Sequence, residues 1–119
     1  MIVKKIEKIE AFTGKEGTHI RQIFSPSETD NTIRYSIAHC TIYPGKSSKP
    51  HTMRTSEMYY IIQGSGVMHV GEEQKQVKRN DVIFVPPMSK QFLENNEDTQ
   101  LVALCIVDPA WKQEDEIDE

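Results

Sequence analysis

The residues whose types and spacing could do chemistry gather between positions 45 and 95. His51 is followed by Met53 two positions later and by Glu57 four positions after that. Because side chains alternate along a strand, these three can share one face of a β-structure. Imidazole and carboxylate groups bind transition metals, and a thioether is a soft, neutral donor. The spacing therefore raises two alternatives: a metal site, or a His–Glu pair that satisfies itself without metal.

A second polar segment runs from Asn80 to Asn95, with Pro86, Met88 and Gln91 between them. Its spacing is that of a strand, a turn and a second strand. The amide of Gln91 can both donate and accept a hydrogen bond. It therefore suits either a metal ligand or a group that holds a hydroxyl or carboxylate of a small molecule in a concave pocket.

Short strands must position these side chains. No window keeps the i, i+3, i+4, i+7 pattern of an amphipathic helix, and the apolar segments end at Gly, Pro or Asn-rich turns. This predicts an all-β domain, an antiparallel sandwich or barrel. We expect strands at 34–43, 58–63, 67–70, 75–78, 82–85, 91–94 and 100–107, and an edge strand at 2–9.

Residues 45–64 and 80–95 resemble the two motifs of the cupin superfamily. The family motifs read G-x5-H-x-H-x3,4-E-x6-G and G-x5-P-x-G-x2-H-x3-N. Asn80 and Met88 stand where the second motif has its two glycines. The other glycine, proline and asparagine positions of the motifs are retained, as Gly45, Gly64, Pro86 and Asn95. The resemblance implies one jelly-roll barrel over residues 1–119, frequently dimeric and with an interior metal site, and we expect an acidic, frayed tail at 112–119.

The resemblance places His51 and Glu57 at two of the family's four metal-ligand positions. Met53 and Gln91 stand where the family has its second and third histidines. A thioether is soft and an amide oxygen is hard, so no divalent ion among Mn, Fe, Ni, Cu and Zn is favoured. We therefore expect a weak or empty metal site formed by His51, Met53, Glu57 and Gln91.

Two further residues are candidates for contacts with a bound molecule. Tyr59 shares the parity of Glu57, so its side chain is predicted to face the interior, either toward a ligand or in a structural hydrogen bond. His39 lies in the strand before the first motif, and the sequence leaves its face open. On the interior side it would supply a missing nitrogen ligand. His69 is predicted to face solvent or a subunit interface, and His19 to lie in a loop.

The composition excludes several classes of partner. The chain has 119 residues, with 14 Lys and Arg against 18 Asp and Glu, for a net charge of −4. This balance provides no basic face for nucleic acid or for an anionic membrane surface. No segment approaches the roughly 20 apolar residues of a membrane span. Cys40 and Cys105 lie in separate predicted strands, and we expect two buried free thiols in a reducing cytoplasm.

The predicted strand at 58–63 is apolar on both faces. Tyr59 and Ile61 share one face, whereas Met58, Tyr60 and Ile62 share the other. A strand of this kind is covered on both sides, which favours a homodimer formed through sheet contacts.

The function we favour is binding of a small molecule in the barrel, beside an atypical and weak divalent-metal site. One alternative is a metal-dependent cupin enzyme of the isomerase, dioxygenase or lyase type. It would act on a small sugar or carboxylate, with His51 and Glu57 holding the metal and with Gln91 and Tyr59 orienting the substrate. A second alternative is a non-catalytic structural dimer.

Overall fold

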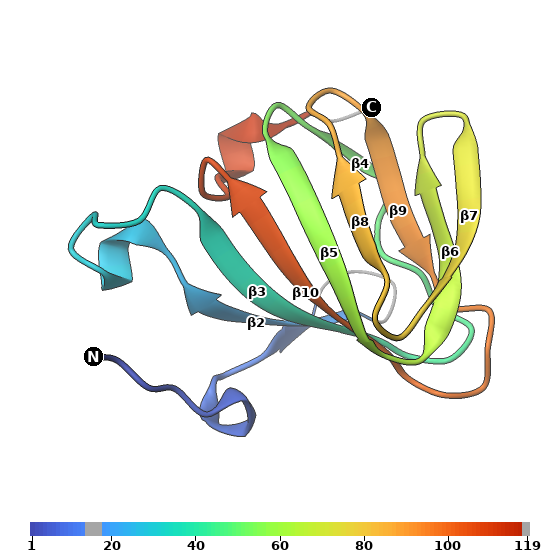
Figure 1. Cartoon of the computed structure of the whole chain (residues 1–119), viewed down its shortest axis with the longest axis horizontal. Coiled ribbons are helices and arrows are strands. Elements are labelled where there is room, and N and C mark those ends of the chain that lie inside the picture. The colour runs from blue at the N-terminus through green and yellow to red at the C-terminus, as the bar shows by residue number, and fades with distance from the viewer. Residues whose placement is uncertain (14–17, 118–119) are drawn as a thin grey trace.

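Two antiparallel β-sheets face each other in the computed structural model, which describes residues 1–13 and 18–117 (Figure 1). Across the first sheet the order is β1 (Phe12–Thr13), β2 (Thr18–Phe24), β3 (Ser36–Ile42), β10 (Leu101–Asp108), β5 (Ser56–Gln63) and β8 (Val82–Val85). Across the second it is β11 (Glu116–Ile117), β4 (His51–Met53), β9 (Lys90–Glu94), β6 (Ser65–Val70) and β7 (Glu73–Lys78). The arrangement confirms the predicted all-β jelly-roll barrel.

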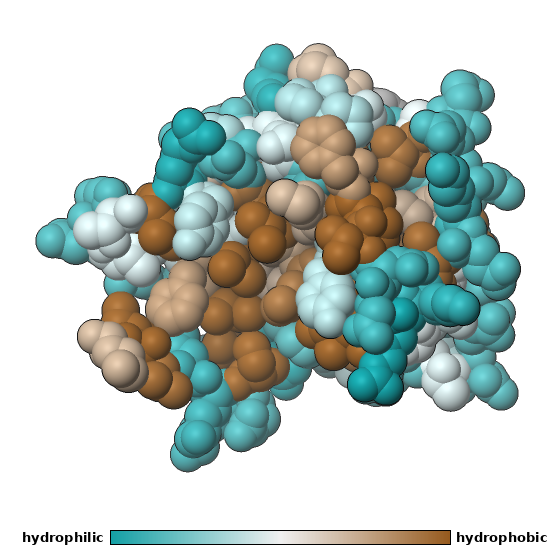
Figure 2. Space-filling view, in the orientation of Figure 1, coloured by the Kyte–Doolittle hydropathy of each residue, from teal (hydrophilic) through white to brown (hydrophobic). Residues whose placement is uncertain are grey.

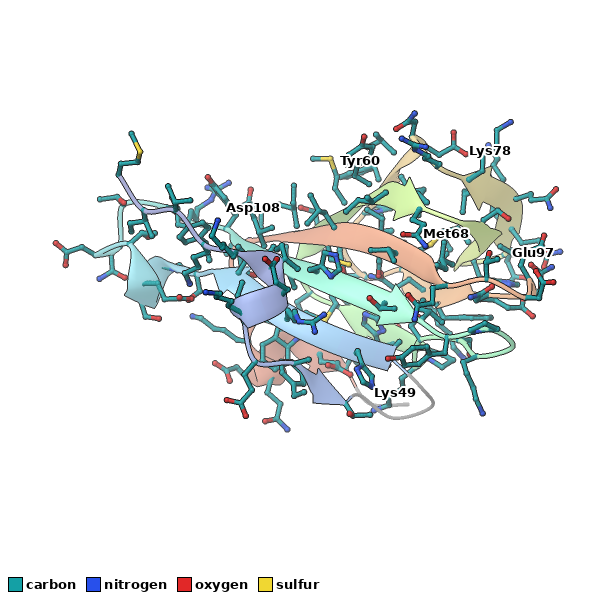
Figure 3. All side chains as sticks on the ribbon, turned by 90° about the horizontal axis from the view of Figure 1, so that it is seen from below. Lys49, Tyr60, Met68, Lys78, Glu97 and Asp108 are labelled. Atoms are coloured by element: carbon teal, nitrogen blue, oxygen red, sulfur yellow. The ribbon has the colours of Figure 1, made fainter. Side chains whose placement is uncertain are left out.

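The core lies between the two sheets because each inner strand alternates apolar and exposed positions. On β5, Tyr59 and Ile61 are buried, whereas Met58 and Tyr60 are 44% and 40% exposed. This confirms the parity predicted for the strand. Figure 3 shows Met68 among the strands and Tyr60 at the outer surface. The largest fully buried apolar side chains are Ile42, Met53, Ile61, Leu93, Leu101 and Val85.

Two residues of the motifs hold the ends of strands in place. Gly64 has φ +85°, and a Cβ at this position would collide with the carbonyl oxygen of Gln100, so only glycine fits the turn. Asn95 is 1% exposed. Its amide nitrogen donates to the carbonyl oxygens of Ile42 (2.9 Å) and Thr99 (2.8 Å). These bonds fix the loops at one end of the barrel.

The N-terminal region differs from the expectation. No strand forms at 2–9; a single 3-10 turn, η1 (Ile6–Lys8), stands there. Strand β2 was missed because its sequence is largely polar, and it pairs with β3 along most of its length. His19 therefore lies in a strand rather than a loop, with its Nδ1 3.3 Å from the Tyr43 hydroxyl. A second 3-10 turn, η2 (Pro26–Glu28), follows β2.

The acidic C-terminal segment is ordered as far as Ile117. The 3-10 turn η3 (Gln113–Asp115) leads into β11, whose residues pair with Met53 and Thr52 of β4. Backbone pairing with the edge of β4 and an ion pair between Glu116 and Lys49 (3.8 Å) hold this acidic sequence there. The last part of the predicted frayed tail, residues 118–119, lies outside the described residues. Within residues 1–13 and 18–117 no helix is long and apolar enough to cross a membrane.

Candidate functional site

Four polar side chains come together inside the barrel from opposite sheets. His51 on β4 and Gln91 on β9 are directly paired in the five-stranded sheet. Glu57 and Tyr59 project inward from β5 of the six-stranded sheet. Glu57, Tyr59 and Gln91 are 7%, 5% and 1% exposed, respectively. The group is a polar cluster in an otherwise apolar interior.

The imidazole of His51 has a defined orientation. Its Nδ1 is 2.8 Å from the carbonyl oxygen of Lys49. A carbonyl oxygen only accepts, so Nδ1 carries a hydrogen and the neutral ring presents the lone pair of Nε2. That nitrogen is 3.9 Å from Oε1 of Glu57. A lone pair that faces a carboxylate is stabilised by a cation between them, either a proton on the ring or a bound metal ion.

The protonation of His51 follows from these neighbours. Burial lowers the pKa of the imidazole, but hydrogen bonding to Glu57 and to the Lys49 carbonyl raises it, and the net shift is upward. The charges of Glu57 and Glu116 act in the same direction. The cluster therefore favours an imidazolium–carboxylate pair at slightly acidic pH.

A hydrogen bond from the Tyr59 hydroxyl to Oε1 of Gln91 joins the two sheets across the interior. Burial, and then the charge of Glu57, raises the pKa of Tyr59 well above its ordinary value. The phenol therefore stays protonated and remains a donor. Since this bond engages the amide oxygen of Gln91, that oxygen is less available to a metal ion.

The donor set does not fit a tight cupin-type metal site. His51 and Glu57 are strong ligands, whereas the thioether of Met53 is soft and neutral, and Gln91 already accepts from Tyr59. Met53 is 1% exposed and packs as a core residue. The described part of the chain contains no group of three His, Cys, Asp or Glu side chains that could hold a metal. What remains is a two-ligand site that water must complete.

His39 does not join this cluster. Its neighbours in the strand, Cys40 and Ile42, pack into the core, so His39 projects from the opposite face of β3. It lies beside Arg21 of β2. Burial, and then the charge of Arg21, lowers the pKa of His39. The missing nitrogen ligand is therefore not restored from β3.

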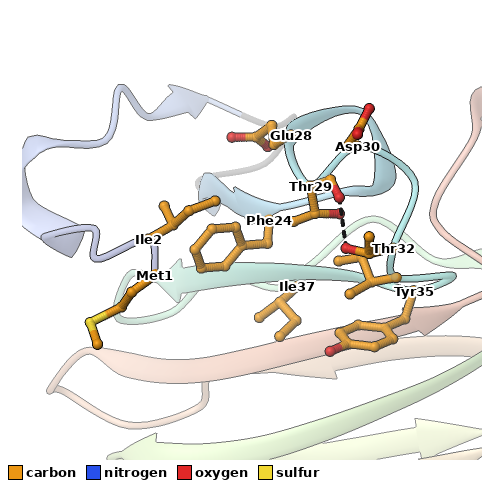
Figure 4. A pocket seen from close by; sticks show the side chains of 10 residues that line it. Met1, Ile2, Phe24, Glu28, Thr29, Asp30, Thr32, Tyr35 and Ile37 are labelled. Atoms are coloured by element: carbon orange, nitrogen blue, oxygen red, sulfur yellow. Dashed lines mark hydrogen bonds between the residues drawn. The ribbon is translucent and has the colours of Figure 1, made fainter.

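His69 also lies outside the barrel interior. Its ring stacks on Phe92, with 4.0 Å between centroids, and its Nε2 is 3.0 Å from Oε1 of Glu94. These side chains border a groove of about 340 Å³. A larger groove of about 530 Å³ lies where β2 ends and β3 begins, between Met1, Phe24 and Tyr35 (Figure 4). Neither groove includes the polar cluster.

Comparison with known proteins identifies the family. Residues 38–107 match the family model described as the cupin domain. The chain belongs to the cupin family. This cupin is 31% identical over 116 residues to the uncharacterized protein MJ1618 of Methanocaldococcus jannaschii, across 97% of this chain and 92% of that protein.

Both a sequence comparison and a structure comparison find similarity to a protein of Thermotoga maritima. An oxalate-binding protein is 28% identical over 103 residues, which cover 85% of this chain and 84% of that protein. The crystal structure of a predicted oxalate decarboxylase superposes with a TM-score of 0.80. It covers 91% of this chain and 99% of that one, at 23% identity. At that identity the likeness shows the jelly-roll fold alone.

Proposed function

We propose that this cupin binds a small polar molecule inside the barrel, in contact with His51, Glu57, Tyr59 and Gln91. The supporting observation is that these four polar side chains converge in the interior while Nε2 of His51 and Oε1 of Glu57 stay 3.9 Å apart, because buried polar groups cost free energy unless each has a partner. The His51 side chain is 19% exposed, so the cluster borders solvent at that residue. A ligand entering there meets groups that already have fixed orientations.

The chemistry of the cluster favours a small carboxylate or a hydroxylated molecule. A protonated imidazole and a phenol hydroxyl are both hydrogen-bond donors, and the Gln91 amide adds a donor and an acceptor. A carboxylate accepts such bonds, and charge-assisted bonds are the stronger ones. The similarity to a protein of Thermotoga maritima named as oxalate-binding is consistent with a carboxylate.

The test is a ligand titration in the presence of EDTA. Purified protein is screened for thermal stabilisation by small carboxylates and monosaccharides, and each hit is then followed by NMR. A ligand that binds only the folded state stabilises it by about 2.7 kcal/mol at 100 times its Kd. We expect Tyr59→Phe and His51→Gln to weaken binding at least tenfold. His69→Gln, which changes a histidine outside the barrel, should leave the affinity unchanged.

A metal measurement separates this function from its enzymatic alternative. The protein is incubated with Mn, Fe, Ni, Cu or Zn as divalent ions, desalted, and analysed for bound metal. We expect clearly less than one equivalent, since two ligands of the family set are replaced. One full equivalent of a single metal, lost in His51→Ala, would instead favour a metal-dependent enzyme.

We further propose a homodimer formed through the outer face of the six-stranded sheet. Met58 and Tyr60 lie beside Phe84 and Val82 across β5 and β8. The last two are 61% and 66% exposed. Leu104 and Ile106 of β10 continue the same face. Figure 2 shows apolar side chains gathered over the middle of the molecule, where Figure 1 places β3, β10 and β5.

A second copy is the occupant that this face favours. None of the outward residues of β5 and β8 just named is charged, and the centres of protein interfaces are depleted of charge. A contiguous exposed apolar patch on a small domain is typical of an interaction surface. Nucleic acid and membrane partners stay unsupported because the net charge is −4. Both cysteines are free thiols, which is consistent with the reducing cytoplasm proposed for this protein.

A further inference from the structure

Two free thiols occupy neighbouring positions on the inner wall of the barrel. Cys40 of β3 is paired with Ala103 of β10, and Cys105 of β10 is paired with Ala38 of β3. The cysteines are therefore diagonal neighbours on adjacent strands. Both pack against the same apolar cluster between the sheets. Across β3 and β10 the residue opposite each cysteine is alanine, whereas on the other side Cys40 is paired with Ile20 of β2 and Cys105 with Tyr59 of β5.

The two side chains contact each other. The thiols of Cys40 and Cys105 share a hydrogen bond, and this bond together with burial raises the pKa of Cys105 well above its ordinary value. Cys105 is thus a thiol rather than a thiolate in the free protein, and the reactivity of this sulfur toward oxidants, which needs a thiolate, is suppressed. Cys40 is only half-buried, so a small ion can reach the pair from its side.

We propose that Cys40 and Cys105 form a two-coordinate binding site for a soft monovalent metal ion, with Cu(I) as the type case. Thiolate sulfur is the ligand that selects Cu(I) among the first-row metals. A structural zinc ion takes four ligands, and the described residues offer no cluster of three acidic, His or Cys side chains. A pair of sulfurs in apolar surroundings fits an ion that is satisfied by two donors.

The binding step exchanges protons for the metal. Each S–H bond breaks, each sulfur forms one bond to the ion, and two protons leave to solvent. The ion stays Cu(I) and neither cysteine is oxidised. Because two protons leave when the ion binds, binding should strengthen as pH rises. His51 and Glu57 supply no ligand to this site, so different variants test the two proposals, although Tyr59 of the proposed ligand site is the strand neighbour of Cys105.

The test is an anaerobic competition between the reduced full-length protein and the Cu(I) chelator bathocuproine disulfonate. We expect one equivalent of Cu(I) per chain to be retained, and X-ray absorption to show two sulfur ligands. Cys40→Ala and Cys105→Ala should each lower the affinity at least 100-fold, since even outer-shell losses cost 10–100-fold in metal affinity. Met68→Leu removes another buried sulfur, and His51→Ala removes a ligand of the other site. Both should leave Cu(I) affinity unchanged.

Three results would overturn the proposal. They are loss of all Cu(I) to the chelator, unchanged affinity in both alanine variants, and absorption spectra dominated by nitrogen or oxygen ligands. The spectrum is recorded on the wild-type protein, so it decides the question even if replacing a core cysteine prevents folding.

Discussion

The hydrogen bond between Tyr59 and Gln91 connects the two sheets through their interior, and its loss should be costly. Tyr59→Phe leaves the buried amide oxygen of Gln91 without its donor. We expect the free energy of unfolding to fall by about 1–3 kcal/mol, measured by urea denaturation. Tyr60→Phe is the matched control, because its hydroxyl bonds Asn80 at the exposed surface. Equal losses of unfolding free energy in the two variants would show that the interior hydrogen bond contributes no more to stability than the exposed one.

His51 should make stability depend on pH in a defined direction. Burial is the largest single influence and lowers its pKa, but Glu57, the Lys49 carbonyl and Glu116 together raise it by more, so the pKa is raised on folding. The stabilisation is therefore complete below the unfolded pKa of about 6.5 and is lost as pH rises through the folded pKa. Urea denaturation of wild type and Glu57→Gln between about pH 5 and 8.5 measures it. The stability advantage of wild type should shrink as pH rises; an advantage that grows would contradict the assignment.

At the level of strands and turns, the second motif has residues with positive φ at the two positions where the cupin motif has glycine. Asn80 and Met88 adopt φ values of +76° and +69°. Such conformations cost a residue with a side chain about 1–2 kcal/mol, and Asn tolerates them better than Met. The substitution of glycine by Met88 is thus a local strain that the fold accommodates.

Met88→Gly should stabilise the protein. Met88 is 59% exposed, so little packing is lost, and relief of the backbone cost outweighs the greater chain entropy of glycine. We expect a gain of roughly 0.5–1 kcal/mol in urea denaturation. Asn80→Gly should gain less, because it also removes the acceptor of the Tyr60 hydroxyl. A loss of stability in Met88→Gly would mean that its side chain packs in solution.

The strands that the sequence predicts are those with β-branched or apolar runs between clear turns, such as β5 and β10. Strand β2 cannot be predicted from the sequence because its residues are largely polar. It forms through backbone pairing with β3, which no local sequence pattern indicates. The sequence predicts that His51 and Glu57 share one face of a strand, but they lie on β4 and β5 in opposite sheets and meet across the interior. The Tyr59–Gln91 bond and the contact of Cys40 with Cys105 depend on register between strands far apart in the chain, so neither could be read from the sequence.

For the molecule as a whole, the apolar sheet face predicts the state of association. Phe84→Glu places a charge in the centre of the proposed interface, and burying an unpaired charge is costly. We expect light scattering after size exclusion to show a dimer for wild type and a monomer for the variant. Gln76→Glu, on β7 of the other sheet, is the control and should remain dimeric. A monomeric wild-type protein at all concentrations would rule out the dimer.

The pairing of β11 with β4 also bears on how the protein avoids aggregation. Strand β4 has three residues, and one of its edges is occupied by Glu116 and Ile117. The amide of Arg54 extends this contact by donating to the Asp115 carbonyl oxygen at 2.9 Å. If residues 113–117 detached from β4, the backbone groups along this edge of β4 would be unpaired and open to pairing with another chain. Open strands of this kind recruit further strands, so we expect the acidic segment to oppose strand addition at this edge, and its negative charge to repel the same segment of another molecule.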